Sequence, residues 1–515
     1  MTQNSIIPSL ILSILFLIST IPSPSTQQSI INMPSLTPAS CDYKHDLQNR
    51  YSCYITNLTA IMSEPLHIVG THLPGYTDDD VLAVYHVNCR MNRFNGEVMN
   101  KFANLRILNL RRTHLHLISP IAFDRCDNLE ELNIEGNSVT SLVPLLLQNC
   151  VNFKNLHAFN NRIANIPENL FGSTRSLEVF DIHRNRLPSV PGNLFQNMTN
   201  LRMFDIGSNY ISELSPNILL NAVNLEYIDI SRNNFDDQQT VMQLLTGHLA
   251  LRNIQMFSNL FPMFSFNFFT QFNRLDNLAV GGLGNSSNIA WQALPASLRL
   301  LSTYGIGEEI PANAFNRLTS LTTLDISGTG ITVLHKDTFK ALTNLEWLFI
   351  MYTSIKTIHP ELFISQGNLQ ILFLNWNEIE EIPAGALAPL VNLGYNTSEF
   401  GLHFFGNKLQ RLSSSSFGQH PHLDYIDFSF NEIMEIDRGI FSRFSPTVSF
   451  FGLRFNNCTH TAFYNASNLD QDSEEMLWCF YNYEGMETTT PNGVGGSFRG
   501  FRVFVLIFVG ILSVF

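Results

Sequence analysis

The sequence has few basic residues and none of the common catalytic signatures. Lys and Arg number 30 against 43 Asp and Glu, which gives a formal charge of −13. An acidic chain without a basic stripe is a poor binder of nucleic acid, so that class of partner is not expected. The patterns H-E-x-x-H, G-x-S-x-G and the P-loop are absent from the chain. We therefore predict no enzyme activity, no cofactor and no metal site.

The chain contains instead one phrase that recurs every 24 residues. It reads LEVFDIHRN at 177–185, LRMFDIGSN at 201–209 and LEYIDISRN at 225–233. Each copy fits L-x-x-L-x-L-x-x-N, a pattern in which a short strand and a return loop form one coil of a solenoid. Each coil of a solenoid buries its apolar face against its neighbours only, so a chain of 515 residues need not divide into several domains.

The phrase continues through fifteen coils, after a degenerate first coil that begins at Val81. The fifteen begin at Leu105, Leu129, Phe153, Leu177, Leu201, Leu225, Leu251, Leu275, Leu298, Leu321, Leu345, Leu369, Glu399, Leu423 and Val448. We predict an α/β solenoid with a horseshoe shape. Its concave face is a parallel β-sheet, and loops, 3-10 turns or short helices form its convex side.

Two columns of residues support this register. An asparagine occupies the ninth position of most phrases, where a buried amide can satisfy backbone groups of neighbouring coils. This column contains Asn137, Asn161, Asn185, Asn209, Asn233, Asn259, Asn377, Asn407, Asn431 and Asn456. A second column is expected to stack its rings inside the convex side. It contains Phe123, Phe171, Phe195, Phe269, Phe315, Phe339, Phe363, Phe417 and Phe441.

Four of the seven cysteines lie outside the regular coils. In an oxidising compartment Cys41 and Cys53 are expected to form a disulfide in an N-terminal cap over the open core. Cys458 and Cys479 are expected to do the same at the C-terminal end. The cap and the degenerate first coil cover 41–104, the repeats 105–457 and the second cap 458–482.

The other three cysteines lie within the coils. Cys89 falls at the asparagine position of the first coil, where we expect a buried thiol. Cys126 and Cys150 occupy equivalent loop sites in consecutive coils, and the spacing of stacked coils is compatible with a disulfide. Such sites also commonly hold small apolar residues that point inward, and we expect two buried thiols here.

Both ends of the chain carry signals of export. Residues 1–25 have the apolar run and the small residues of a signal peptide. The apolar tail at 503–515 is shorter than the roughly 20 residues of a spanning helix, and it follows a flexible stalk at 483–502. This arrangement matches a glycosylphosphatidylinositol (GPI) attachment signal with Asn492 as the attachment residue. A short transmembrane tail is the alternative.

Six sequons are predicted to carry glycans: Asn57, Asn197, Asn285, Asn396, Asn457 and Asn465.

Three aspartates form one candidate binding site. Asp181, Asp205 and Asp229 fill the fifth position of successive phrases, where side chains point out from the concave sheet. Carboxylates about 5 Å apart repel one another and raise one another's pKa. They can form a patch that binds a basic partner. Alternatively, they form a solvated acidic stripe in which Arg184 and Arg232 partly offset the repulsion between the carboxylates. We expect the solvated stripe rather than a calcium site, and we retain binding of a basic partner as the alternative function.

Aromatic residues in two later phrases form the second candidate. Trp347, Phe349 and Tyr352 come from one phrase, and Phe373 and Trp376 from the next. Their positions face outward, so we expect five exposed rings on adjacent strands. Apolar patches of this kind mark partner sites more often than isolated residues do. The alternative is that the curved concave face packs the rings on one another.

The repeats, the phenylalanine column and the terminal cysteines together resemble extracellular leucine-rich repeat proteins of the typical 24-residue class. Similar architectures occur in Toll-type ectodomains and in the GPI-anchored adhesion proteins chaoptin and connectin. The resemblance implies a non-enzymatic recognition or adhesion protein, tethered at the cell surface and binding an extracellular protein partner through its concave face, with homophilic contact as one option. The alternative is an innate-immunity factor that recognises microbial ligands or other repeat proteins.

Overall fold

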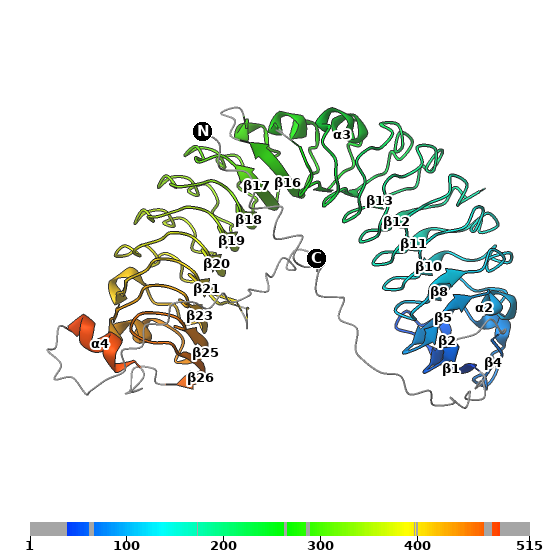
Figure 1. Ribbon diagram of the computed structural model, residues 1–515, viewed down its shortest axis with the longest axis horizontal. Helices are drawn as coiled ribbons and strands as arrows, with labels where there is room; N and C mark the ends of the chain where they lie inside the picture. Colours follow the sequence, from blue (N-terminus) through cyan, green and yellow to red (C-terminus); the bar gives the residue numbers. More distant parts are fainter. Residues whose placement is uncertain are drawn as a thin grey trace, which may run out of the picture.

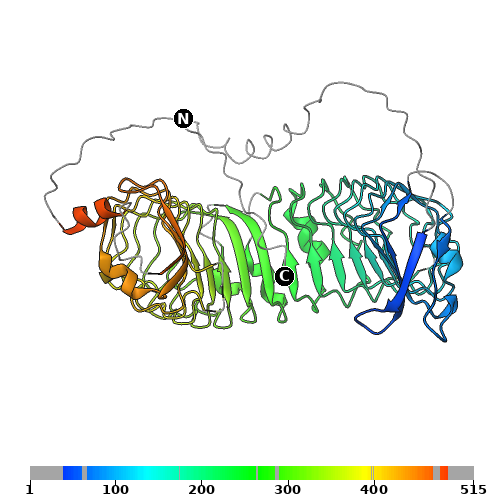
Figure 2. The same ribbon diagram turned by 90° about the horizontal axis from the view of Figure 1, so that it is seen from below.

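The computed structural model describes residues 39–60, 66–172, 174–261, 265–284, 289–395, 397, 400–467 and 476–484. The chain winds into an open arc, with short strands along its inner edge and loops along its outer edge (Figure 1). Seen after a 90° turn, the strands lie side by side across the inner face (Figure 2). The predicted horseshoe solenoid is confirmed.

Every predicted coil supplies one strand to a continuous parallel sheet. These strands are β5 (Ala83–Val87), β8 (Ile107–Asn109), β10 (Glu131–Asn133), β11 (Asn155–His157), β12 (Val179–Asp181), β13 (Met203–Asp205), β14 (Tyr227–Asp229), β15 (Asn253–Gln255), β16 (Asn277–Gly284), β17 (Leu300–Ile306), β18 (Thr323–Asp325), β19 (Trp347–Phe349), β20 (Ile371–Phe373), β21 (Leu402–His403), β23 (Tyr425–Asp427) and β25 (Thr447–Gly452). Most contain three residues, but β16 has 8 and β17 has 7. This is the stretch in which the asparagine column is interrupted.

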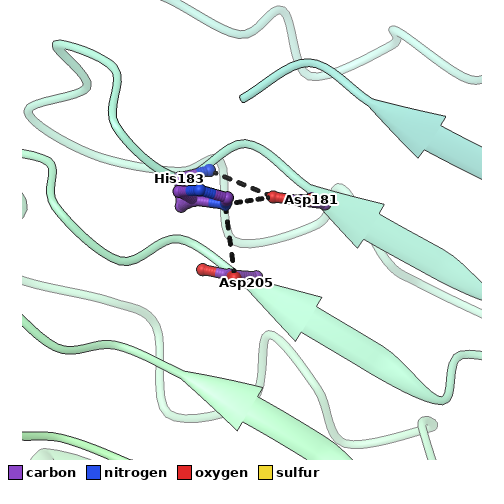
Figure 3. Close-up of side chains that lie close together, drawn as sticks. All are labelled: Asp181, His183 and Asp205. Atoms are coloured by element: carbon purple, nitrogen blue, oxygen red, sulfur yellow. Dashed lines mark hydrogen bonds and ion pairs between the residues drawn. The ribbon is translucent and has the colours of Figure 1, made fainter. Parts of the chain in front are cut away.

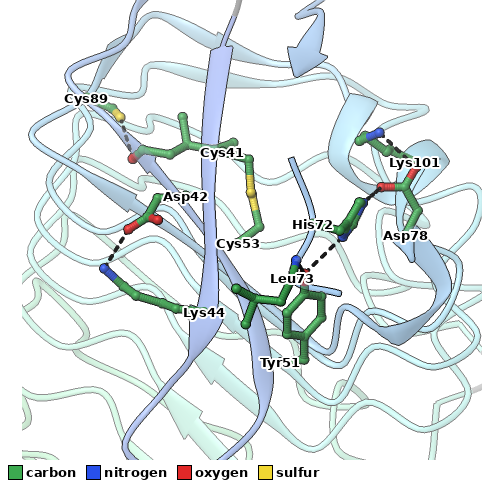
Figure 4. The surroundings of a disulfide bond; sticks show 11 residues. Cys41, Asp42, Lys44, Tyr51, Cys53, His72, Leu73, Asp78, Cys89 and Lys101 are labelled. Carbon is green, nitrogen blue, oxygen red and sulfur yellow. Dashed lines mark hydrogen bonds and ion pairs between the residues drawn. A yellow bond between two sulfur atoms is a disulfide. The ribbon is translucent and has the colours of Figure 1, made fainter. Parts of the chain in front are cut away.

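Antiparallel strands cover both ends of the sheet. At the N-terminal end β1 (Ala39–His45) pairs with β2 (Tyr51–Thr56), and β2 continues the sheet onto β5. The Cys41–Cys53 disulfide joins β1 to β2, with Cα atoms 5.4 Å apart (Figure 4). At the other end β26 (Ala462–Ser467) pairs with β25, and the Cys458–Cys479 disulfide connects to α4 (Leu477–Glu484). Both expected terminal disulfides are therefore present.

The remaining elements are short. The strands are β3 (Thr59–Ala60), β4 (Ile68–Val69), β6 (Arg90–Met91), β7 (Arg93–Phe94), β9 (Leu117–Ile118), β22 (Arg411–Leu412) and β24 (Glu435–Ile436). The helices are α2 (Glu97–Lys101), α3 (Gln238–Leu245), η1 (Asp78–Asp80), η2 (Phe266–Gln271), η3 (Trp291–Ala293), η4 (Ser414–Ser416) and η5 (Arg438–Arg443). No helix among the described residues is long and apolar enough to cross a membrane.

The two predicted columns form the interior of the solenoid. The Asn185 Nδ2 donates to the carbonyls of Ala158 at 3.0 Å and Ile182 at 2.9 Å, and its Oδ1 accepts from the Ile163 N–H at 2.9 Å. One amide therefore satisfies backbone groups in two neighbouring coils. The phenylalanine column is buried except at Phe441, which is partly exposed.

One expectation about the coil cysteines is wrong. Cys126 and Cys150 form a disulfide, with Cα atoms 4.7 Å apart and a sequence separation of 24. They are not two buried thiols, because stacking of consecutive coils brings equivalent positions within the normal Cα range of a disulfide. Cys89 is a buried free thiol, as expected. Its Sγ donates to the Ile55 carbonyl at 3.3 Å.

Candidate functional site

The character of the concave face changes along the arc. Because side chains alternate across a strand, the fifth residue of each phrase faces away from the buried fourth residue. From β11 to β15 this fifth position holds His157, Asp181, Asp205, Asp229 and Gln255. From β19 to β21 it holds Phe349, Phe373 and His403. The face therefore has an acidic segment followed by an aromatic segment.

The acidic segment is organised around His183, a residue that the sequence analysis missed. Its Nδ1 lies 2.7 Å from Asp181 Oδ1 and 3.4 Å from Asp205 Oδ2 (Figure 3). The His157 Nδ1 lies 3.7 Å from Asp181 Oδ2. The ring of His183 also stacks on that of Phe159, with centroids 4.5 Å apart. The signal available in the sequence was a histidine two residues after an outward-facing aspartate.

Burial and the carboxylates set the protonation of this cluster. Burial opposes the charged form of His183, but hydrogen bonds and charges from Asp181 and Asp205 outweigh it and raise its pKa to about 10. Burial raises the pKa of Asp205. For Asp229, burial and then the charge of Asp205 raise the pKa to about 7. Burial also opposes the charge of Asp181, yet hydrogen bonds with His157 and His183 lower its pKa.

The expected solvated acidic stripe is therefore wrong. Asp181 and Asp205 are 4% and 5% exposed, while Asp229 is partly exposed. Arg232 was expected to offset the repulsion between these carboxylates. Its guanidinium lies 5.5 Å from the centroid of the Phe257 ring. Strand pairing places the carboxylates side by side, and neighbouring side chains then cover them. Two buried carboxylates offer little surface to a basic protein partner.

Stacked rings cross the aromatic segment in an inner ladder, which we define as Phe349, Phe373, His403, Tyr425 and Phe450. Successive ring centroids lie 5.2, 4.0, 5.0 and 4.7 Å apart. The predicted exposure of Phe373 is wrong, because its neighbours on both sides leave it only 8% exposed. Phe349 and Trp347 are half-buried. The rings pack on one another, which was the stated alternative.

A second, rim ladder lies beside the first, and we define it as Tyr352, Trp376, Phe405, Phe430 and Phe455. Its successive centroids lie 6.1, 5.1, 4.8 and 4.3 Å apart. The two end members, Tyr352 and Phe455, are 46% and 53% exposed. Tyr352 and Trp376 are among the residues predicted from the sequence, and the other three are not. The signal was the recurrence of aromatic residues at the seventh or eighth position of later phrases.

Four members of the rim ladder adopt a backbone conformation that bulky residues avoid. The φ angles of Tyr352, Trp376, Phe430 and Phe455 are 54°, 55°, 57° and 59°. The left-handed region costs a non-glycine residue roughly 1–2 kcal/mol. The same phrase position is also left-handed in other coils, with glycine at Gly136 and Gly328 and with arginine at Arg112, Arg184 and Arg232. The coil requires the turn at this position but not the ring.

His403 introduces a polar group into the inner ladder. It is 7% exposed, and its ring lies between those of Phe373 and Tyr425. Its Nε2 has no hydrogen-bond partner within the described part of the chain. Burial lowers the pKa of His403 to about 3, so the ring is neutral at physiological pH.

The predicted glycosylation and lipidation residues fall into two groups. Asn57, Asn197 and Asn457 are exposed, and the Asn457 Nδ2 donates to the Glu432 carbonyl at 3.0 Å. Asn465 lies in β26. The positions 285, 396 and 492 lie outside the described residues, as do the predicted signal peptide and the C-terminal tail.

Comparison with known proteins supports the repeat assignment. The family model described as "Leucine rich repeat" matches residues 103–163, 175–235, 308–355 and 319–379. No curated protein matches the sequence.

Similar solved structures share the fold at low sequence identity. The ectodomain of the Arabidopsis thaliana receptor kinase GASSHO1/SCHENGEN3, in complex with Casparian strip integrity factor 2, is 19% identical with a TM-score of 0.55. The match covers 83% of this chain and 52% of that ectodomain, about half its length. A leucine-rich repeat protein of Leptospira interrogans is 20% identical with a TM-score of 0.49, covering 69% of this chain and 86% of that one. Toll in the Drosophila Toll–Spatzle complex is 17% identical with a TM-score of 0.48, covering 74% and 61%. The matched residues thus contain leucine-rich repeats, and the chain has the horseshoe fold seen in leucine-rich repeat ectodomains.

Proposed function

We propose that this protein is a non-enzymatic recognition protein that binds a protein partner through the inner and rim ladders of its concave face. The observation that carries the proposal is that aromatic rings occupy this left-handed position at Tyr352, Trp376, Phe430 and Phe455, where other coils hold glycine, serine, asparagine or arginine. Glycine at these positions would give the same turn without the steric cost. The repeat accounts for the turn, which Arg112, Arg184 and Arg232 also adopt, but it does not account for the run of rings, and a run of this kind is a reason to infer function.

The ladders have the composition of a protein-binding surface. Aromatic residues are enriched at interfaces, where they bury large areas and form the residues that dominate affinity. The rings of the inner ladder are stacked and cover one another's faces, so this ladder presents ring edges, which carry partial positive charge. Ring edges attract the faces of other aromatic side chains and carbonyl oxygens. A partner segment with exposed aromatic or aliphatic side chains fits this surface.

The proposed location is the cell surface. Three disulfides within the described residues support an oxidising, extracellular compartment. The predicted signal peptide at 1–25 and the lipid attachment at Asn492 would then deliver and tether the protein. Release of the full chain from cells by phosphatidylinositol-specific phospholipase C is the expected result. Recovery in body fluid without a lipid would favour the innate-immunity alternative.

The binding proposal is tested with a cell-surface screen of extracellular proteins, using a soluble 26–490 protein that retains every described residue. The variant carries Tyr352→Ala and Trp376→Ala, which remove two adjacent rings of the rim ladder. We expect normal secretion and loss of the partner found with the native sequence. The matched control is Tyr210→Ala, because Tyr210 is 53% exposed but lies outside both ladders. Unchanged partner binding by the double variant would contradict the proposal.

A further inference from the structure

We propose that His157, Asp181, His183 and Asp205 form a binding site for one divalent transition-metal ion of the zinc class. The site lies in the acidic segment of the concave face, and it does not depend on the proposed partner surface. Ligand atoms of Asp181, His183 and Asp205 all lie within 4.8 Å of one another. His157 adds a second imidazole on the neighbouring strand.

The separations between ligand atoms suit a small tetrahedral ion. Bonds from Zn²⁺ to nitrogen and oxygen are about 2.0–2.1 Å, which places tetrahedral donor atoms about 3.3 Å apart. The His183 Nδ1 lies 2.7 Å from Asp181 Oδ1 and 3.4 Å from Asp205 Oδ2. The His157 Nδ1 to Asp181 Oδ2 distance is 3.7 Å. The two distances at His183 bracket the required separation, so small side-chain rotations bring three donors around one ion. His157 contacts the other oxygen of Asp181 and must rotate towards the ion to become the fourth ligand.

The scaffold holds these side chains in place. His157, Asp181 and Asp205 end strands β11, β12 and β13, and they are direct partners in the sheet register. The planes of the His183 and Phe159 rings are 11° apart, and this stacking fixes the orientation of the imidazole. A metal site needs ligands positioned by rigid elements and by supporting contacts around them. Strand pairing and ring stacking provide both.

The ligand types select the class of ion. Imidazole and carboxylate ligands suit zinc and its neighbours, whereas Ca²⁺ and Mg²⁺ prefer sites built from oxygen alone. Asp181 and Asp205 are buried carboxylates, and a divalent ion compensates their charge more completely than one imidazolium does. Binding through the His183 Nδ1 displaces the proton on that atom, which passes to solvent, so metal uptake releases protons.

The test uses the full secreted chain after treatment with a chelator. Titration with ZnCl₂ is followed by calorimetry, and Co²⁺ binding by its visible absorption spectrum. We expect one saturable equivalent of Zn²⁺ per chain and the absorption of tetrahedral Co²⁺. The variants are His183→Gln and Asp205→Asn, with circular dichroism and thermal unfolding to confirm folding. Each should weaken Zn²⁺ binding by about 100-fold or more.

Two further variants test whether other histidines bind the ion and whether a loss of binding is caused by misfolding. His157→Ala removes a half-buried side chain and should weaken binding even where the other two variants fail to fold. His422→Ala removes an exposed loop histidine and should leave the first equivalent unchanged. No binding by the native chain, or binding that persists in His183→Gln, Asp205→Asn and His157→Ala, would overturn the proposal.

Discussion

The rings of Tyr352 and Trp376 stack with their planes 14° apart, and both residues have a left-handed backbone, with φ of 54° and 55°. The two residues occupy the same phrase position in consecutive coils. The backbone turn is therefore a property of the repeat, whereas the ring is a property of this part of the chain. Replacement of the ring at this position therefore separates the contribution of the ring to folding from its contribution to partner binding.

Trp376→Gly should abolish partner binding with a modest change in stability. Glycine relieves a left-handed cost of about 1–2 kcal/mol, while each lost ring pair contributes about 0.5–1.5 kcal/mol. Trp376 takes part in three ring pairs, and the two effects oppose each other, so we expect the free energy of unfolding to fall by no more than about 3 kcal/mol. Leu374→Ala is the contrast, because Leu374 is 1% exposed and should cost about 2–5 kcal/mol. Denaturant titration of both variants measures the difference.

Asn185→Leu should be strongly destabilising, although leucine is apolar and of similar size. The substitution leaves the carbonyls of Ala158 and Ile182 and the Ile163 N–H without their partner. Each buried unsatisfied group costs about 1–3 kcal/mol, so we expect a loss of about 3 kcal/mol or more. Asn193→Ala changes an exposed asparagine and serves as the control in the same denaturant titration. Equal stability of the two variants would contradict a structural role for the column.

Removing the Cys126–Cys150 disulfide should destabilise the N-terminal half. Its sequence separation of 24 residues corresponds to about 3 kcal/mol in the loop-entropy model. The variant is Cys126→Ala with Cys150→Ala, measured by thermal unfolding. Cys89→Ala removes the free thiol and should leave all three disulfide-linked peptides intact in a non-reducing digest. Free thiols at positions 126 and 150 in the native protein would rule out the bond.

Stability should fall in mild acid because of His403. Its pKa is about 3 in the folded protein and about 6.5 when unfolded, so the unfolded state binds more protons between these values. Stability is therefore complete above pH ~6.5 and decreases as the pH falls, by up to about 1.4 kcal/mol per pH unit.

The matched variant for this prediction is His403→Phe, which keeps an aromatic ring and cannot be protonated. Denaturant titrations at pH 7 and pH 5 compare it with the native chain. Both proteins retain His86, whose pKa is lowered to about 4 by burial, so only the difference between them reports on His403. An identical pH dependence of stability in the two proteins would show that protonation of His403 does not cause the loss of stability in acid.

The sequence alone determined the shape of the molecule. The phrase repeats at 24 residues in most coils, and its asparagine and phenylalanine columns each satisfy a requirement that recurs from coil to coil. Such requirements are local, because a coil contacts only its neighbours. The strand positions and the burial of Cys89 followed from that register, and the two terminal disulfides followed from cysteines that lie outside the regular coils.

Only the tertiary structure decided what the concave face presents. His403 stacks on Tyr425 although the two occupy different phrase positions, so reading one column at a time could not reveal the ladder. His183 joins Asp181 to Asp205 across two strands. The Cys126–Cys150 bond depends on a Cα distance of 4.7 Å. The repeat sets the spacing of the coils, but side-chain contacts between neighbouring coils determine which groups are exposed, paired or bonded.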